Sequence, residues 1–196
     1  PKLREKRLGL GRPHRIRRQF QEFVGQVLIR QRRVGVTLAR VLVAGVGGLG
    51  TIVAAYLAAA GVGFLRLADN DRVEISNLNR QLLFQPDDIG REKAVAATEK
   101  LHNLNPEIQI EGINKTIDDE TTDELIKDVD LIVDALDNFT TRFILNSVAF
   151  TRRLPLIHGA VRGFFGQATT LIPGKTACLK CIFAQSPPRE IFSIFG

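Results

Sequence analysis

Apolar runs and helical apolar spacings alternate along most of this chain. The run Val41 to Ala44 has the length of a buried parallel strand, and Phe64 to Ala68 predicts a second one. Between them, apolar residues recur at helical spacing and predict a helix over 49–60, with Gly61 as its C-cap. The expected apolar face of this helix consists of Leu49, Ile52, Val53, Tyr56, Leu57 and Ala60.

The alternation continues toward the C-terminus. Further strands are expected over 107–113, 130–135 and 155–159, and a helical stretch over 89–103. Residues 166–174 predict a strand that extends the sheet in the antiparallel sense. The fold class is therefore α/β, a Rossmann-like, mainly parallel sheet with helices on both faces and an antiparallel extension towards the C-terminus.

The turn after the first strand carries a glycine cluster, GVGGLG. Gly45, Gly47 and Gly48, together with Gly50, allow backbone N–H groups to approach phosphate oxygens without a Cβ in the way. Asp69 follows the second strand, about twenty residues later, where a carboxylate can accept hydrogen bonds from ribose hydroxyls. The pattern predicts a nucleotide site.

Polar residues accumulate where the later strands are expected to end. Because parallel strands place ligands at their carboxyl edge, we expect a cluster of cations, amides and one metal-capable aspartate around the same nucleotide. The residues concerned are Asn77, Arg80, Gln81, Lys93, Asp137 and Asn138. A lone exposed arginine or lysine more often forms a surface ion pair, and only the set as a whole favours a triphosphate site.

Five motifs occur in order between about Arg15 and Phe183: GVGGLG, DNDRVEISNLNRQLLFQ, IGREKA, DALDNFTTR and CLKC. In this order they resemble the ThiF/HesA-like adenylyltransferases, relatives of the ubiquitin-activating enzymes that include the molybdopterin-synthase adenylyltransferase. The resemblance implies ATP-dependent adenylation of the C-terminal Gly-Gly carboxylate of a small ubiquitin-fold sulfur-carrier protein, with release of pyrophosphate. It also implies that residues 40–196 form the adenylation domain, with an incomplete C-terminal part.

The resemblance assigns roles residue by residue. It implies that the glycine loop, with Gly48 against the nucleotide, and Asn138 line the ATP site, that Asp69 takes the ribose, and that Asp137 holds magnesium. It implies phosphate contacts for Asn77, Arg80 and Lys93, with Gln81 beside them. Concentrated positive charge is what the reaction needs, because a carboxylate must attack a phosphate while charge grows on the leaving pyrophosphate.

Charge is distributed unevenly. Residues 1–40 hold 12 Lys+Arg against 2 Asp+Glu, whereas the remainder holds 15 against 19. We expect 1–39 to be a basic N-terminal helical extension, and a solvated tail or a nucleic-acid contact would each fit its charge. A third interpretation is that RIRRQ is similar to the family motif RYxRQ. The resemblance implies that the second arginine of the motif, here Arg18, enters the partner's ATP site in a homodimer. Ile16 stands where the motif has an aromatic residue, and Arg17 is a second arginine that could insert.

Cys178 and Cys181 are the two cysteines of the sequence. One CxxC supplies two of the four ligands that structural zinc takes, so a partial or vestigial zinc site and a redox pair both remain open. His158 is expected to be a hydrogen-bonded core residue. No cysteine follows Cys181, so transfer to a downstream thiol is not expected and the reaction would end at the acyl-adenylate.

Composition agrees with a cytoplasmic enzyme core. Hydrophobic residues make up 44% of the chain, yet no run resembles a membrane span or a signal peptide. Three rival functions share parts of the pattern: an NAD-dependent oxidoreductase, an ATP-dependent dehydratase of a modified tRNA adenosine, and a non-catalytic scaffold. Hydride transfer has no need for Arg80, Lys93 and Asp137, and a scaffold has no reason to keep them. The motif order after Asp137 is nearer to the carrier-protein activators, which makes a nucleic-acid partner unexpected.

Overall fold

The computed structural model describes residues 38–183 and contains one six-stranded sheet in the order β3-β2-β1-β4-β5-β6. Every neighbouring pair is parallel except β5 and β6, which form an antiparallel pair at the C-terminal side. This arrangement confirms the predicted fold class. The strands are β1 (Arg40–Ala44), β2 (Phe64–Ala68), β3 (Gln109–Ile113), β4 (Leu131–Asp134), β5 (Leu156–Arg162) and β6 (Phe165–Leu171).

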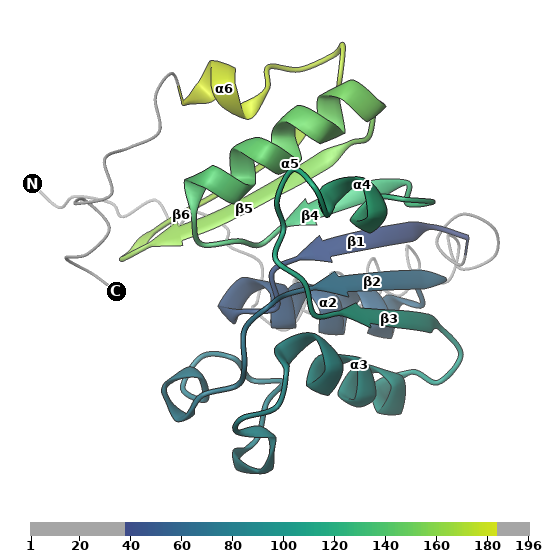
Figure 1. Ribbon diagram of the computed structural model, residues 1–196, viewed down its shortest axis with the longest axis vertical. Helices are drawn as coiled ribbons and strands as arrows, with labels where there is room; N and C mark the ends of the chain where they lie inside the picture. Colours follow the sequence, from purple (N-terminus) through teal and green to yellow (C-terminus); the bar gives the residue numbers. More distant parts are fainter. Residues whose placement is uncertain (1–37, 184–196) are drawn as a thin grey trace, which may run out of the picture.

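Helices cover both faces of the sheet (Figure 1). Alternate residues of β1 point to opposite faces, so Val41 and Val43 pack with α2 and α3 while Leu42 packs with α4 and α5. The helices are α2 (Gly48–Ala60), α3 (Lys93–Leu104), α4 (Thr122–Leu125), α5 (Phe139–Arg152) and α6 (Leu179–Ile182), with 3-10 turns η1 (Ile75–Asn77) and η2 (Pro86–Asp88).

The direction of strand addition reverses at β1. From β1 the chain adds β2 and then β3 on one side, and returns to add β4 on the other. The carboxyl ends of β1 and β4 therefore flank a topological switch point, which is where doubly wound sheets bind ligands. The fold itself places the glycine loop and Asp137 next to one crevice.

The buried face of α2 differs from the predicted one. Small residues, Thr51, Ala54 and Ala58, face the sheet and are buried, whereas Ile52 is exposed and Tyr56 is 74% exposed. Because this helix is apolar on every side, its hydrophobic period could not identify the packed face. The small side chains allow α2 to lie close to the strands.

Several element boundaries also differ from the sequence prediction. The helix expected over 89–103 begins at Lys93, because η2 and Gly90 (φ +84°) shape the preceding turn. The strand expected from 107 begins at Gln109, and β5 continues to Arg162 instead of ending at 159. Within residues 38–183, no helix is both long and apolar enough to cross a bilayer. The expected basic extension, 1–39, lies almost entirely outside the described residues.

Candidate nucleotide site

The glycine loop joins β1 to α2 and closes tightly on itself. Gly45 has φ +88°, and a Cβ at this position would lie 3.0 Å from the carbonyl oxygen of Ala135. A Cβ on Gly50 would lie only 1.8 Å from the Gly45 carbonyl oxygen. Gly47 and Gly48 instead have room, and face the side chains of Gln81 and Arg80. The closure of the loop therefore requires glycine at positions 45 and 50, whereas Gly47 and Gly48 form its open side.

The N-terminus of α2 opens at this loop without a capping side chain. Its N-cap is Gly47, and its first turn carries no acidic residue. The first N–H groups of a helix have no partner within the helix and carry a partial positive charge. An anion such as phosphate is the natural partner for such an end, and the pocket described below includes Gly47, Gly48 and Leu49 in its wall.

Asp69 stands at the end of β2 and is anchored by two backbone groups. Its Oδ2 accepts from the Val46 N–H at 2.7 Å, and its Oδ1 accepts from the Asp71 N–H at 2.8 Å. Burial raises the pKa of the Asp69 carboxyl, and these two hydrogen bonds offset part of that rise. Each oxygen keeps a second lone pair, so the carboxylate can still accept from a ligand hydroxyl at the pocket wall.

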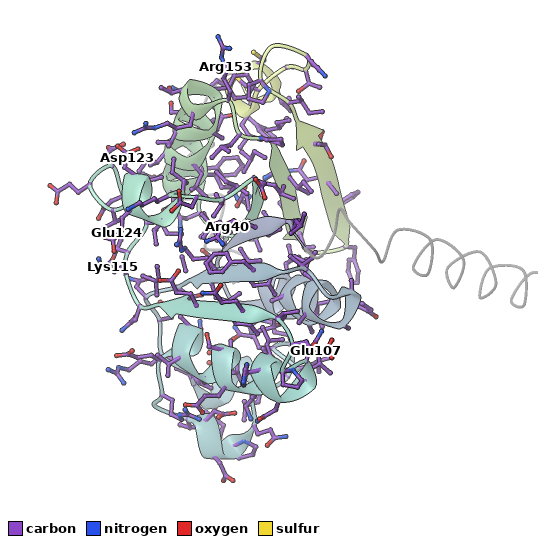
Figure 2. All side chains as sticks on the ribbon, turned by 90° about the vertical axis from the view of Figure 1, so that its right-hand side faces the viewer. Arg40, Glu107, Lys115, Asp123, Glu124 and Arg153 are labelled. Carbon is purple, nitrogen blue, oxygen red and sulfur yellow. The ribbon has the colours of Figure 1, made fainter. Side chains whose placement is uncertain are left out.

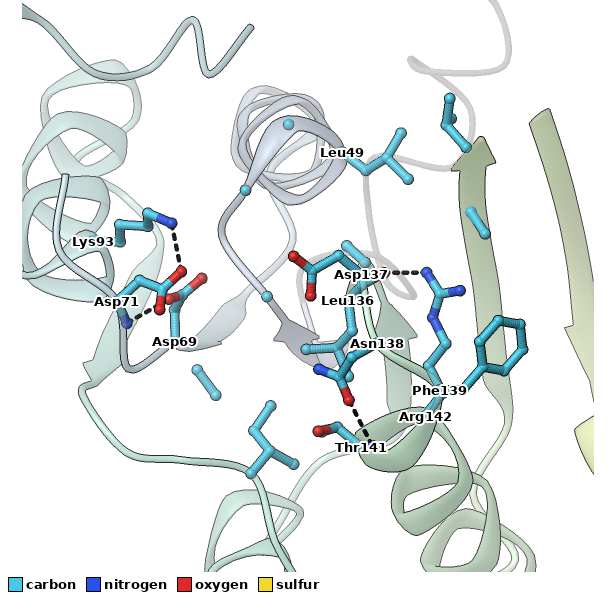
Figure 3. A pocket seen from close by; sticks show the side chains of 18 of the residues that line it. Leu49, Asp69, Asp71, Lys93, Leu136, Asp137, Asn138, Phe139, Thr141 and Arg142 are labelled. Atoms are coloured by element: carbon cyan, nitrogen blue, oxygen red, sulfur yellow. Dashed lines mark hydrogen bonds and ion pairs between the residues drawn. The ribbon is translucent and has the colours of Figure 1, made fainter. Parts of the chain in front are cut away.

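Lys93 begins α3 and is already paired. Its Nζ lies 2.8 Å from Asp71 Oδ2, and its side chain is 7% exposed while that of Asp71 is 64% exposed. Figure 3 shows this pair beside Asp69 at one side of the pocket. Sequence reasoning missed Asp71. The signal was present in the string DND, where a second acid follows Asp69 by two residues.

Arg80 carries a charge that no acid balances within residues 38–183. Its guanidinium donates to the Ser76 carbonyl oxygen at 2.8 Å and to Asn79 Oδ1 at 3.1 Å, both neutral acceptors. Asn77 is buried and uses its Oδ1 to accept from the Glu74 N–H, which shapes η1. Gln81 is also buried, and its Oε1 has no hydrogen-bond partner among the described residues.

Asp137 and Asn138 lie across the glycine loop from Asp69 and Lys93 (Figure 3). Asn138 is the N-cap of α5, and its Oδ1 accepts from the Thr141 N–H at 2.9 Å. Asp137 is exposed, and no hydrogen bond or ion pair joins its side chain to the rest of 38–183. A carboxylate held at the pocket wall without a protein partner suits a cation.

A buried polar network supports the loop that carries Asp137. Asp134 accepts from the Leu136 N–H at 3.1 Å, and Arg142 donates to the Leu136 carbonyl oxygen while its Nε lies 3.5 Å from Asp134. The imidazole of His158 lies 2.6 Å from Asp134 on the other side. This confirms that His158 is a hydrogen-bonded core residue. The roles of Asp134 and Arg142 were missed, although a buried strand that ends in an acid signals a need for partners.

These groups surround one pocket of about 1410 Å³. Ligand pockets commonly measure about 300–1,000 Å³, so there is room for a nucleotide and for part of a second ligand. Lys115 and Asn70 also line the pocket. The Lys115 Nζ lies 2.7 Å from Glu124 Oε2 of α4, and Figure 2 labels both residues. The structure thus brings together, around one pocket, every residue predicted to bind the nucleotide or its magnesium, whereas Arg18 lies outside the described residues.

The two cysteines lie away from the pocket wall, around the start of α6. Their Sγ atoms are 3.6 Å apart. Partial burial by itself raises the pKa of the Cys178 thiol, but hydrogen bonds from the backbone of Cys181 and Lys180 and from Asn146 bring it below its usual value. In the described part of the chain, no group of three or more His, Cys, Asp and Glu residues is arranged to hold a metal.

Comparison with known proteins decides the family. The model of the ThiF family matches residues 20–194. The chain belongs to the ThiF family. The match extends from the basic segment to beyond α6 and so includes every element of the pocket.

Relatives within this family share the same core. The chain is 44% identical over 149 residues to the SAMP-activating enzyme E1 of Haloferax volcanii, covering 76% of this chain and 55% of that protein. It is 42% identical over 151 residues to the sulfur carrier protein ThiS adenylyltransferase of Bacillus subtilis, covering 76% and 45%. A crystal structure of E. coli MccB with AMPCPP and MccA superposes with a TM-score of 0.74 at 29% identity, covering 87% and 52%. The chain therefore spans about half the length of these proteins.

Proposed function

We propose that this chain provides the ATP site of an adenylyltransferase that activates the C-terminal Gly-Gly carboxylate of a small ubiquitin-fold sulfur carrier. The observation that carries this proposal is the convergence, in one pocket, of an uncapped helix N-terminus, Arg80 without an acidic partner in 38–183, and the unpaired Asp137. The names of the relatives support the substrate class, since they include a sulfur carrier protein adenylyltransferase and a SAMP-activating enzyme.

The reaction joins two anions. A carboxylate oxygen of the carrier attacks the α-phosphorus of ATP, the bond from that phosphorus to the bridging oxygen breaks, and pyrophosphate leaves with the electron pair. The products are the acyl-adenylate and pyrophosphate. Catalysis here depends on positioning and on concentrated positive charge. The N–H groups of α2, Arg80 and Lys93 would supply that charge, and Asp69 would hold the ribose hydroxyls.

Lys93 would have to exchange its partner for this role. In the structure its ammonium is neutralised by Asp71. Asp71 is 64% exposed and can turn to water, whereas Lys93 is buried and stays in place. A triphosphate that enters the pocket would therefore displace a mobile surface carboxylate from a fixed cation.

Asp137 fits a magnesium ion. Oxygen ligands suit Mg²⁺, which commonly binds one or two carboxylates together with substrate phosphates. The unpaired carboxylate of Asp137 offers such a ligand, with the Asn138 amide beside it. Magnesium would neutralise charge on the reacting phosphates. Among this chain's own residues, the Asp134–Arg142 network would keep Asp137 at the pocket wall.

Assembly and the cysteines complete the proposal. We infer a cytoplasmic homodimer in which Arg18 of one chain reaches the ATP site of the other. The exposed apolar side chains of Ile52 and Tyr56 on α2 support an interface. Cys178 and Cys181, whose Sγ atoms lie 3.6 Å apart, would supply two thiolate ligands of a structural zinc site.

The test is ATP–pyrophosphate exchange with a panel of ubiquitin-fold proteins that end in Gly-Gly. We expect exchange that requires both magnesium and one member of the panel. Calorimetry should show tighter binding of Mg-ATP than of NAD, because NAD makes no use of a metal aspartate. Tighter binding of NAD, or exchange with no panel member, would reject the proposal.

A further inference from the structure

A chain of hydrogen bonds leads from the buried end of β4 to the pocket wall. Asp134 Oδ2 lies 2.6 Å from His158 Nδ1, and His158 Nε2 lies 3.2 Å from Gln167 Nε2. Asp134 and His158 are fully buried, whereas Gln167 is exposed on β6 and lines the pocket. Packing holds the side chains of Asp134 and His158, whereas the Gln167 amide is open to a ligand.

This geometry determines the orientation of the Gln167 amide. A carboxylate only accepts hydrogen bonds, so the short contact with Asp134 places the imidazole proton of His158 on Nδ1. In this tautomer Nε2 offers a lone pair to a donor. Only the NH2 group of Gln167 can satisfy that lone pair, which turns the amide oxygen, Oε1, away from His158 as a free acceptor.

A hydrogen-bond acceptor at this position suits the Gly-Gly tail of the carrier and not the phosphates of ATP. The phosphates of ATP present acceptors, which a carbonyl oxygen cannot bind. The neighbouring wall is largely apolar and consists of Ala160, Val161, Phe165 and Phe183. A Gly-Gly tail has no side chains to recognise, so its binding depends on hydrogen bonds to its backbone. Its N–H groups are donors of the kind that Oε1 requires.

We propose that Gln167 binds a backbone N–H of the carrier's C-terminal tail through Oε1, and that the Asp134–His158 pair positions the Gln167 amide for this contact. This inference rests on the proposed adenylation. Gln167 touches the substrate and His158 acts through Gln167, so the first is a binding residue and the second a positioning residue.

The first test is nitrogen NMR of the 15N-labelled protein. With three histidines in the sequence, the His158 signals can be assigned by comparison with a His158→Gln variant. We expect Nδ1 to be protonated and Nε2 unprotonated at pH 7. In Gln167→Glu, a carboxylate would stand near Nε2 and favour its protonation, so the Nε2 signal should move to the protonated range. A protonated Nε2 in the wild type, or no response to Gln167→Glu, would overturn the positioning role.

The second test is kinetic and uses the Gly-Gly carrier that is most active in exchange. Gln167→Ala should raise KM for that carrier by about five- to tenfold, the worth of one hydrogen bond, and leave KM for ATP unchanged. Thr170→Ala on the same strand is the control, because Thr170 is exposed but outside the pocket wall, and it should change neither value. Normal carrier KM in Gln167→Ala would reject the inference while wild-type exchange still supports adenylation. If no carrier supports exchange in the wild type, the proposed function fails and the tail-binding role fails with it.

Discussion

Lys93 and Asp137 differ in how far the protein itself balances their charge. Lys93 is buried and paired with Asp71 at 2.8 Å, whereas Asp137 is exposed and has no partner within 38–183. A side chain that the fold does not use can be replaced without a large loss of stability. At the scale of single residues, Asp137 therefore offers the cleaner separation of function from folding.

We predict that Asp137→Ala lowers ATP–pyrophosphate exchange by roughly a hundredfold or more, comparable to the loss of one strong electrostatic stabiliser. Its thermal unfolding should match that of the wild type. Asp119→Ala, at an exposed acid outside the pocket wall, serves as the control and should keep normal exchange. Near-normal exchange by a folded Asp137→Ala protein would reject the metal-binding role.

At the scale of elements, the loop between β1 and α2 shows how a single motif divides its tasks. Gly50 has no room for a Cβ against the Gly45 carbonyl, whereas a Cβ on Gly48 would meet the Arg80 side chain at 3.8 Å and its carbonyl oxygen at 4.0 Å, both ordinary contact distances. The motif letters are the same at both positions. Backbone closure explains Gly50, and the proposed approach of the nucleotide would explain Gly48.

Gly50→Ala should therefore lower the free energy of unfolding by about 1–3 kcal/mol or more, the usual range for overpacking. Gly48→Ala, the matched variant, should change it by less than about 0.5 kcal/mol, since no fixed atom lies in the way. Urea unfolding followed by circular dichroism measures both. Equal losses in the two variants would contradict this division.

The turn before α3 contains a buried ion cluster around Asp88. Its carboxylate accepts from the Gln85 N–H at 2.8 Å and pairs with Lys100 at 2.9 Å and Arg91 at 3.1 Å. Burial alone would raise the pKa of Asp88, but Lys100, the Gln85 N–H and Arg91 together lower it below its usual value. A lowered pKa in the folded state means that the stabilisation is present above the unfolded value, about 3.9, and is lost as the pH falls below it.

Asp88→Asn should thus cost roughly 1–2 kcal/mol of unfolding free energy at pH 7, because charged hydrogen bonds are lost. The difference from the wild type should shrink as the pH falls below about 4, because the unfolded chain then takes up a proton at Asp88 and the stabilisation by the folded carboxylate is lost. Asp87→Asn, on the exposed neighbour in η2, is the control and should have little effect at either pH. A difference that is independent of pH would contradict the linkage.

For the whole molecule, the distribution of charge suggests how two chains cooperate. The first 40 residues hold 12 Lys+Arg against 2 Asp+Glu, whereas the remainder, with 15 against 19, is net acidic. A basic segment is attracted to an acidic body, and an arginine supplied in trans is a known way to balance charge in phosphoryl transfer. This supports the proposed entry of Arg18 into a partner's site.

We predict that Arg18→Ala and Asp137→Ala are each nearly inactive alone, and that mixing the two chains restores exchange. The mixed dimer would hold one intact site, with Asp137 from one chain and Arg18 from the other. Native mass spectrometry of the mixture confirms that mixed dimers form. A mixture that contains them but remains inactive would show that Arg18 acts within its own chain or has no catalytic role.

The sequence by itself determined the order of elements and the location of the crevice. Strand runs such as Val41 to Ala44, the glycine turn, and Asp69 at a strand end are local signals, and right-handed parallel crossovers leave few ways to assemble them. The family followed from the same short motifs, because they are contiguous along the chain. The match to the ThiF family model confirms the family that these motifs indicated.

Only the tertiary structure decided which side chains are already paired and which are free. Lys93 meets Asp71 across 22 positions, and His158 meets Asp134 across 24, so neither contact is visible in a local pattern. The packed face of α2 was likewise settled by the space against the sheet, since its apolar residues surround the helix. Pairing and burial depend on what packing brings together from distant segments, and those energies have no signature in any single stretch of sequence.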